Sequence, residues 1–222
     1  MSTDAPPTTT PAPATTFLTP SSWTEPLVME AVFPKRQPLE VDLGCGKGRF
    51  LMARARHHPD RNFLGVDRLF VRLQRLDRRI LRANLPNLRL LRIENDYATQ
   101  HLLSPCSVAV FYVFFPDPWP KRRHHRKRLF TPEFLAHARQ ALMPGGIIHV
   151  ATDHADYAEQ IFKLFARDPA FEPAAIFTPS DEERTDFECH YVGQGHPIHR
   201  GAYRLAAPPC GLKPEAQPAG PN

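Results

Sequence analysis

The sequence predicts one α/β domain of the Rossmann-like type, with a mostly parallel central sheet and helices on both faces. Short apolar runs alternate with stretches of helical periodicity, which is the pattern of successive βαβ units. A glycine-rich turn at 44–48 joins the first apolar run to the first helical stretch. The run 108–115 is apolar on both alternating faces, as in a parallel strand covered on each side. The chain has 222 residues, 42% of them hydrophobic, which is enough for one buried core.

Five strands are predicted, each a short apolar run bounded by turn residues. In chain order they are 39–43, 62–66, 88–93, 108–115 and 147–151. The first helix runs from the glycine turn to Arg56 and stops before Pro59. The second follows residue 66 and carries Leu69, Leu73, Leu76 and Ile80 on one apolar face.

The later helices are predicted from their first residues. Thr131 and Pro132 are typical of a helix start, as N-cap and first helical position, and that helix runs to Met143. Asp153 is the predicted cap of the next helix, whose buried face includes Tyr157, Ile161, Leu164 and Phe165. We expect residues 174–205 to form strands of reduced regularity.

Composition divides the chain into three parts. Residues 1–22 and 206–222 are rich in Pro, Thr, Ala and Ser and cannot bury enough apolar surface to offset the entropy of ordering. Both are predicted to be flexible tails, and 23–205 to be the domain. The longest apolar run has eight residues, whereas a membrane helix needs about 18 or more, which excludes a membrane protein.

Positive charge gathers in two places in a chain whose net charge is +5. The segment Lys121–Arg128 has six Lys or Arg in eight residues and no acid, so a polyanion such as a phosphate backbone is its expected partner. A second cluster consists of arginines whose spacing places them along one face of a helix. For this cluster a solvated face is slightly favoured over a polyanion-binding one. The cluster comprises Arg68, Arg72, Arg75, Arg79 and Arg82.

The glycine turn predicts the cofactor. Asp42 ends the first strand, and Gly44 and Gly46 leave room for a ligand against backbone N–H groups. Its G-x-G-x-G spacing departs from the G-x-G-x-x-G of dinucleotide sites. Asp67 ends the second strand, where an acid binds ribose hydroxyls. Together these features favour S-adenosylmethionine, a sulfonium cation with no phosphate, over a nicotinamide dinucleotide.

Two further segments follow strand ends. Asn95 and Asp96 come after the third strand, where an amide or carboxylate contacts the adenine of this cofactor class. Phe115–Lys121 follows the central strand, and its Pro116 and Pro118 fix the backbone around Asp117. A rigid carboxylate beside the cofactor, adjoining the basic segment, is the pattern of a positioned catalytic group.

These residues resemble the bacterial tRNA (guanine-N7-)-methyltransferases, the TrmB family, over about residues 38–204. The resemblance rests on Phe115–Trp119 with Lys121 and 123–128, supported by 151–153 and 185–188. It implies a class I S-adenosylmethionine-dependent methyltransferase fold and methylation of a guanosine in the tRNA variable loop. Family members often have Glu at the positions of Asp42 and Asp67, and a basic residue after the position of Glu188.

The resemblance also implies residue roles. Asp117 would be the active-site residue. Cofactor contacts would come from Asp42, Gly44, Gly46, Asp67, Asn95, Asp96 and Asp117. Substrate guanosine contacts would come from Lys121, Asp153, Thr185, Asp186, Phe187 and Glu188. RNA contacts would come from Arg123, His124, His125, Arg126, Lys127 and Arg128.

Two other functions stay open. One is an exocyclic-amino nucleic-acid methyltransferase, although such enzymes carry a D-P-P-Y type of motif and Asp117 lies between two prolines. The other is a non-catalytic RNA-binding module with a relict cofactor site. We expect no metal, because the cysteines form no C-x-x-C pair and the histidines no H-x-x-x-H pair. A cytoplasmic location is expected, since residues 1–16 lack the parts of a secretory signal. We also expect a monomer or weak homo-oligomer.

Overall fold

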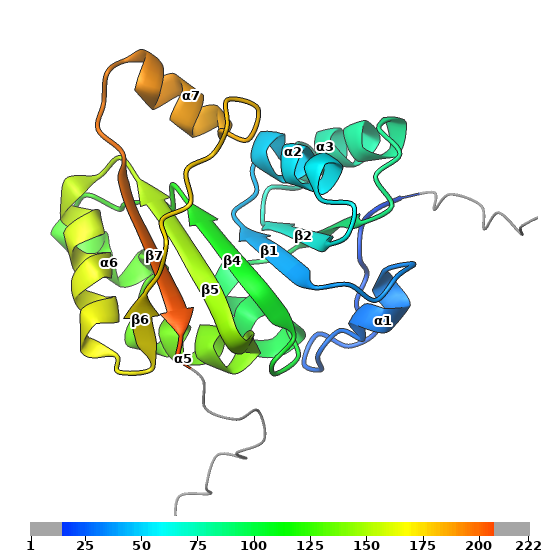
Figure 1. Cartoon of the computed structure of the whole chain (residues 1–222), viewed down its shortest axis with the longest axis horizontal. Helices are drawn as coiled ribbons and strands as arrows, with labels where there is room; N and C mark the ends of the chain where they lie inside the picture. Colours follow the sequence, from blue (N-terminus) through cyan, green and yellow to red (C-terminus); the bar gives the residue numbers. More distant parts are fainter. Residues whose placement is uncertain (1–14, 207–222) are drawn as a thin grey trace, which may run out of the picture.

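The computed structural model describes residues 15–206, which form a central sheet of seven strands. Figure 1 shows this sheet between the helices. The strand order is β3-β2-β1-β4-β5-β7-β6. The first five strands are parallel, and β7 runs antiparallel to both β5 and β6. The strands are β1 Leu39–Leu43, β2 Asn62–Asp67, β3 Leu88–Arg92, β4 Val108–Phe114, β5 Leu142–Thr152, β6 Phe171–Pro173 and β7 His199–Leu205. The predicted fold class is confirmed.

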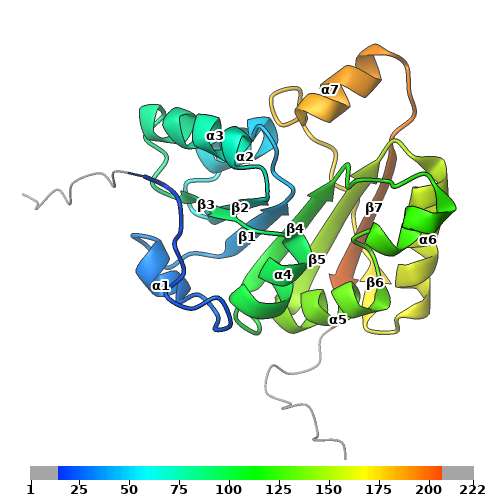
Figure 2. The same cartoon turned by 180° about the vertical axis from the view of Figure 1, so that it is seen from behind.

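Helices connect the strands and cover both faces of the sheet (Figures 1 and 2). The α-helices are α1 Met29–Val32, α2 Arg49–His57, α3 Phe70–Arg82, α4 Asn95–Tyr97, α5 Pro132–Ala141, α6 Ala155–Arg167 and α7 Asp186–Gly193. A π-helical turn, η1, covers Ala98–Leu102, and a 3₁₀ helix, η2, covers Arg122–Lys127. Among the described residues, no helix has both the length and the hydropathy to cross a membrane.

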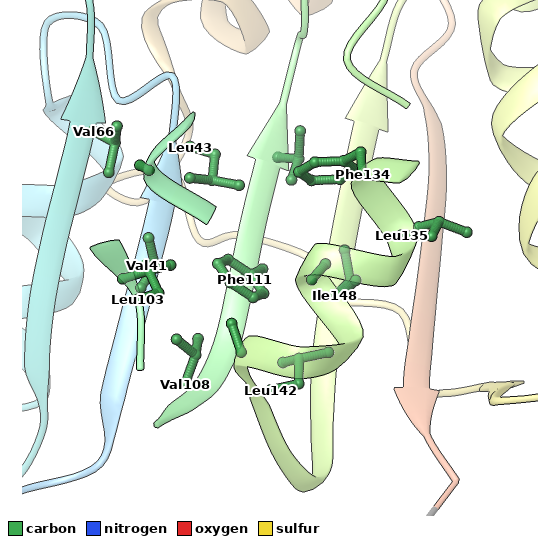
Figure 3. Packing of buried hydrophobic residues seen from close by; sticks show 14 of the residues in the cluster. Val41, Leu43, Val66, Leu103, Val108, Phe111, Phe134, Leu135, Leu142 and Ile148 are labelled. Carbon is green, nitrogen blue, oxygen red and sulfur yellow. The ribbon is translucent and has the colours of Figure 1, made fainter. Parts of the chain in front are cut away.

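Side-chain alternation along β1 separates the main core from the functional face. Val41 and Leu43 point into the core beneath α5, together with Phe111 and Ile148 (Figure 3). Because successive side chains of a strand point to opposite faces, Glu40 and Asp42 lie on the other face, the one that α2 covers. The sequence pattern of β1 therefore places two carboxylates under a helix rather than in solvent.

The turn before α2 requires glycine for two reasons. Gly48 has a φ of 71°, in the left-handed region that a residue with a Cβ adopts at a cost. A Cβ at this position would also lie 2.4 Å from the side chain of Leu76, so the turn packs directly on α3. Leu73, Leu76 and Ile80 are buried along α3, which confirms three of the four predicted apolar positions, whereas Leu69 is the N-cap and is exposed.

Three predictions about helices are wrong. Helix α5 ends at Ala141 instead of running to Met143, because Leu142 already pairs with Val108 as the start of β5. The cap of α6 is His154 rather than Asp153, because the ring Nδ1 of His154 accepts the N–H of Tyr157. Residues 186–193 form the helix α7 where strands were expected. The missed signal is a capping pattern, S/T-x-x-E: the hydroxyl of Thr185 accepts the N–H of Glu188.

The described part of the predicted N-terminal tail includes residues that contact the sheet. Phe17 pairs with Leu90 as an isolated bridge at the outer edge of β3, and Thr16 donates two hydrogen bonds to Asp77 of α3. Residues 1–14 and 207–222, which make up most of both predicted tails, lie outside the described residues. The domain bounds 23–205 stay a prediction.

Candidate active site

Two adjoining pockets open at the carboxyl edge of the parallel strands, where open α/β sheets bind ligands. One has a volume of about 370 Å³ and includes Asp42, Phe50 and residues of α7. The other has a volume of about 540 Å³ and includes Asp67, Asn95 and Asp117. They share Gly44, Gly46, Arg72, Phe114 and Phe187. The glycine turn therefore faces both pockets, and a ligand placed against it reaches into each.

Asp42 is a buried acid without a protein partner. Its side chain lines the smaller pocket, the residue is 4% exposed, and its carboxyl makes no hydrogen bond or ion pair within residues 15–206. Burial, together with the nearby charge of Asp67, raises its pKa to about 8. A buried carboxyl facing a pocket is stabilised in its charged form by a cationic ligand.

Asp67 has a different environment, because backbone groups occupy both carboxylate oxygens. One oxygen accepts the N–H of Gly46 at 3.0 Å, and the other accepts the N–H of Leu69 at 2.8 Å. Asp67 thus ties the glycine turn to the start of α3. Each oxygen keeps a second lone pair, so a ribose hydroxyl can still donate to it.

Asn95 and Asp96 both line the larger pocket but differ in their neighbours. The Asn95 amide lies against the glycine turn, where a Cβ on Gly44 would be 3.5 Å from its nitrogen. Asp96 instead lies 3.3 Å from the ring of His137 on α5. Of these two side chains, the amide of Asn95 is the one that lies against the glycine turn.

Asp117 lies on a loop with an unusual backbone. Phe115 and Trp119 both have positive φ values, 53° and 43°, an uncommon conformation for bulky residues that often marks functional sites. The side chain of Asp117 is 70% exposed and lies 3.8 Å from the guanidinium of Arg68, which also approaches Glu94 at 3.5 Å. The structure thus brings Asp117 to the same pocket as Asp67 and Asn95.

The basic segment continues from this loop as η2. Lys127 lies over the ring of Trp119, with 4.7 Å between its ammonium and the ring centroid, while Arg123 and Arg126 are exposed. Arg128, also predicted to bind RNA, has different surroundings. It is 3% exposed, and its guanidinium donates to the carbonyl of Pro118 and to Gln160 and Asp156. These contacts use three of the five N–H donors of Arg128, which also lines the larger pocket, and we assign Arg128 to holding the Pro118 loop.

The predicted guanosine residues divide in a similar way. Thr185, Asp186 and Phe187 line the smaller pocket. Glu188 is buried and pairs with Arg200 on β7, so we assign it to fixing α7 rather than to contacting the substrate. Lys121 and Asp153 do not line either pocket; Lys121 is exposed, and Asp153 lies beside the hydroxyl of Tyr191.

A buried ionic network fixes residues 174–185, the segment before α7, and this network was not predicted from the sequence. Glu40 of β1 is 1% exposed and accepts hydrogen bonds from Arg54, Arg61 and the hydroxyl of Tyr112. Arg54 also pairs with Glu183, at 3.3 Å. A second acid in the short strand β1, besides Asp42, was the available signal, because a buried charge requires a partner. The network links the helix behind the glycine turn to the segment that carries Thr185.

Replacing Glu183 by Gln should loosen that segment. We expect KM for the nucleic-acid substrate to rise about five- to thirtyfold, since breaking one charged hydrogen bond costs about 1–2 kcal/mol. Steady-state kinetics and proteolysis within 174–185 measure the effect. The control is Glu182→Gln, because Glu182 is exposed and pairs only with His57 among the described residues. An equal effect of both variants would contradict the anchoring role.

These features fit one ligand class. S-adenosylmethionine combines a cationic end, which suits the unpartnered Asp42, with an adenosine, which suits Asp67 and Asn95 on the other side of the glycine turn. The G-x-G-x-G spacing of the turn also departs from the G-x-G-x-x-G of pyrophosphate-binding dinucleotide sites. Fold and site together define a class I S-adenosylmethionine-dependent methyltransferase.

Comparison with known proteins gives the particular family. A family described as "Putative methyltransferase" matches residues 36–200. The tRNA (guanine-N(7)-)-methyltransferase of Nocardia farcinica is 41% identical over 160 residues, 72% of this chain and 60% of that protein. That of Halorhodospira halophila is 35% identical over 185 residues, 80% of this chain and 79% of that protein. The chain belongs to the tRNA (guanine-N7)-methyltransferase family, and it spans 60% of the length of the Nocardia relative.

Solved structures agree on the fold. The 16S rRNA methyltransferase KamB superposes with a TM-score of 0.59 at 19% identity, covering 81% of this chain and 93% of KamB. The antibiotic-resistance methyltransferase Kmr superposes with a TM-score of 0.56 at 16% identity, covering 81% of this chain and 92% of Kmr. At these identities the likeness concerns the arrangement of the sheet and helices.

Proposed function

We propose that this protein transfers the methyl group of S-adenosylmethionine to N7 of a guanosine in the variable loop of tRNA. The observation that carries the proposal is the meeting of the two pockets at the glycine turn. It places the unpartnered Asp42 and the exposed Asp117 in one continuous site with the basic segment beside it. Family membership supports the same reaction and substrate.

Each side of the site has a proposed role. Asp42, Gly44, Gly46, Asp67, Asn95 and Asp96 hold the cofactor, with Asp117 at its reactive end. Thr185, Asp186 and Phe187 contact the guanosine. Lys121 and Asp153 lie outside both pockets, and they contact the guanosine when bound RNA covers the surface next to the pockets. Exposed cations of η2 bind the RNA backbone.

The residues act chiefly by placement. When bound, the cofactor supplies an electrophilic methyl group, whose bond to sulfur breaks with the electron pair returning to sulfur. Guanine N7 already carries a free lone pair, so no base is needed to remove a proton first. Asp117 accepts hydrogen bonds from N1 and N2 of the base and offsets the positive charge that develops on the ring. Correct alignment is worth at most about 7–11 kcal/mol.

Neutralising the exposed arginines of η2 should weaken tRNA binding. In the triple variant Arg122→Gln, Arg123→Gln, Arg126→Gln, we expect the slope of log affinity against log salt to become shallower by about 2–3, since each lost phosphate contact removes about 0.7–0.9. Filter binding across a salt series measures it. Arg128→Gln is the control: it should lower stability and leave the slope unchanged, because Arg128 is buried. An unchanged slope in the triple variant would make η2 a solvated face.

Direct proof of the reaction uses bulk unmodified tRNA and labelled cofactor. We expect label in tRNA, chain cleavage at 7-methylguanosine, and a nucleoside mass spectrum of that product. Methylation on an exocyclic amino group would favour the alternative chemistry. Absence of cofactor binding by calorimetry would favour a non-catalytic RNA-binding module.

Cellular context is also part of the proposal. The protein acts in the cytoplasm on tRNA, as a monomer or weak homo-oligomer, without a metal. Within residues 15–206, no group of three or more His, Cys, Asp and Glu side chains could hold a metal ion.

A further inference from the structure

Four exposed arginines on α3 make no polar contact with the protein. We call Arg72, Arg75, Arg78 and Arg82 the α3 arginine row. None of the four has an ion pair or hydrogen bond to any residue that the structure describes, and all are exposed. The other two arginines of this region differ: Arg79 donates to the carbonyl of Lys47, and Arg68 approaches Glu94 and Asp117.

Packing fixes which way this row faces. Leu73, Leu76 and Ile80 are fully buried on the opposite side of the helix, so α3 cannot rotate to bring its arginines toward carboxylates of the core. Asp77 is the one acid of the helix, and its carboxylate accepts the N–H and hydroxyl of Thr16. Like charges at i,i+3 and i,i+4 destabilise a helix, so this uncompensated row lowers the stability of α3 unless a polyanion binds there.

The row begins at the candidate active site. Arg72 lines both pockets, beside the glycine turn. Trp119, Arg126 and Lys127 line the larger of the same pockets from the loop that follows β4. Figure 2 shows α3 and that loop on opposite sides of the carboxyl edge of the sheet. A polyanion whose base enters the site would therefore have cations on both flanks.

We propose that the α3 arginine row is a second tRNA-binding surface, which holds the phosphates of the strand leading away from the methylated loop. From Arg72 to Arg82 the helix extends about 15 Å, long enough to contact several phosphates. This inference rests on the proposed tRNA substrate. Three of its members, Arg72, Arg75 and Arg82, belong to the helical stripe that the sequence alone slightly favoured as a solvated face.

The test neutralises the part of the row that lies outside the pockets. In the variant Arg75→Gln, Arg78→Gln, Arg82→Gln, tRNA affinity at 150 mM salt should fall at least tenfold, and the salt slope should become shallower by about 2. KM for tRNA should rise by a similar factor, while calorimetric affinity for S-adenosylmethionine should match wild type. The matched control is Arg36→Gln, Arg139→Gln, Arg167→Gln, which removes equal charge from exposed arginines elsewhere.

The outcomes separate this inference from the proposed function. A loss in the α3 variant that the control lacks supports the row. Equal losses of tRNA affinity in both variants would mean that only net charge matters. Unchanged tRNA affinity in the α3 variant would mean that the row is a solvated face. Either result overturns the inference. If wild type itself bound no tRNA, the proposed function would fail first, and filter binding of wild type establishes that before the variants are compared.

Discussion

Replacing Asp117 by Ala is expected to reduce methyl transfer by about a hundred- to a thousandfold, the usual loss when a group that stabilises developing charge is removed. The fold should persist, because the side chain is 70% exposed and its contact with Arg68, at 3.8 Å, is a surface ion pair. Affinity for tRNA should also persist, since the cations of η2 and α3 are untouched. Single-turnover rates with saturating tRNA measure the effect.

The control for Asp117 is Glu94→Gln. Glu94 also approaches Arg68, at 3.5 Å, but it follows β3 instead of the central strand. If placement of the guanine base is the role of Asp117, Glu94→Gln should retain most of the rate. A comparable loss in both variants would mean that neutralising Arg68 matters rather than contact with the base, and normal transfer by Asp117→Ala would remove its catalytic role.

Cofactor binding is expected to depend on pH through Asp42. Burial raises the pKa of this carboxyl to about 8, so it is mostly protonated in the free protein at neutral pH. A cationic cofactor favours the ionised form, and binding at pH 7 should therefore release a proton. Affinity should rise by up to about tenfold per pH unit toward pH 8 and then level off.

Calorimetry in two buffers of different ionisation enthalpy measures that proton release. Asp42→Asn carries no titratable group at this position, so its affinity should be lower and its pH dependence flat between pH 6 and 8. A wild-type affinity that does not change over this range would contradict the assignment of Asp42 to the cationic end of the cofactor.

The raised pKa of Asp42 also affects the free energy of unfolding of the ligand-free protein. Asp42 has a higher pKa folded than its ordinary value of 3.8, so the folded state holds its proton more tightly than the unfolded state. The resulting stability is present below about pH 4 and is lost as pH rises through about 8. Thermal unfolding of the free protein should show this decline in wild type and a smaller one in Asp42→Asn.

Much of the fold followed from local sequence features. The bounds of β1 and the start of α5 at Thr131 and Pro132 agree with prediction because they depend on short-range apolar patterning and capping. Capping also explains the wrong prediction at α7. The capping pattern of Thr185 and Glu188 is present in the sequence, but the prediction of strands for this segment did not use it. The cap of α6 was misplaced by one residue, since His154 competes with Asp153 for the same role.

Exposure of the candidate site residues was harder to predict. Arg128 and Glu188 belong to segments whose neighbours are exposed, yet both are buried in ion pairs with residues distant in sequence, Asp156 and Arg200. Whether a charged residue faces solvent, ligand or a protein partner depends on such pairings. Nothing in a local pattern distinguishes Arg126 from Arg128.

The sequence by itself determined the five parallel strands, the glycine turn, the acids at the strand ends and the basic segment, because each depends on neighbours along the chain. Only the tertiary structure decided that Asp42 lacks a partner, that Glu40 and Arg54 fix the α7 segment, and that the α3 arginines continue from the pocket. Those properties depend on which groups meet across the sheet, and burial there sets the electrostatic cost that makes a carboxylate a binding group or a structural one.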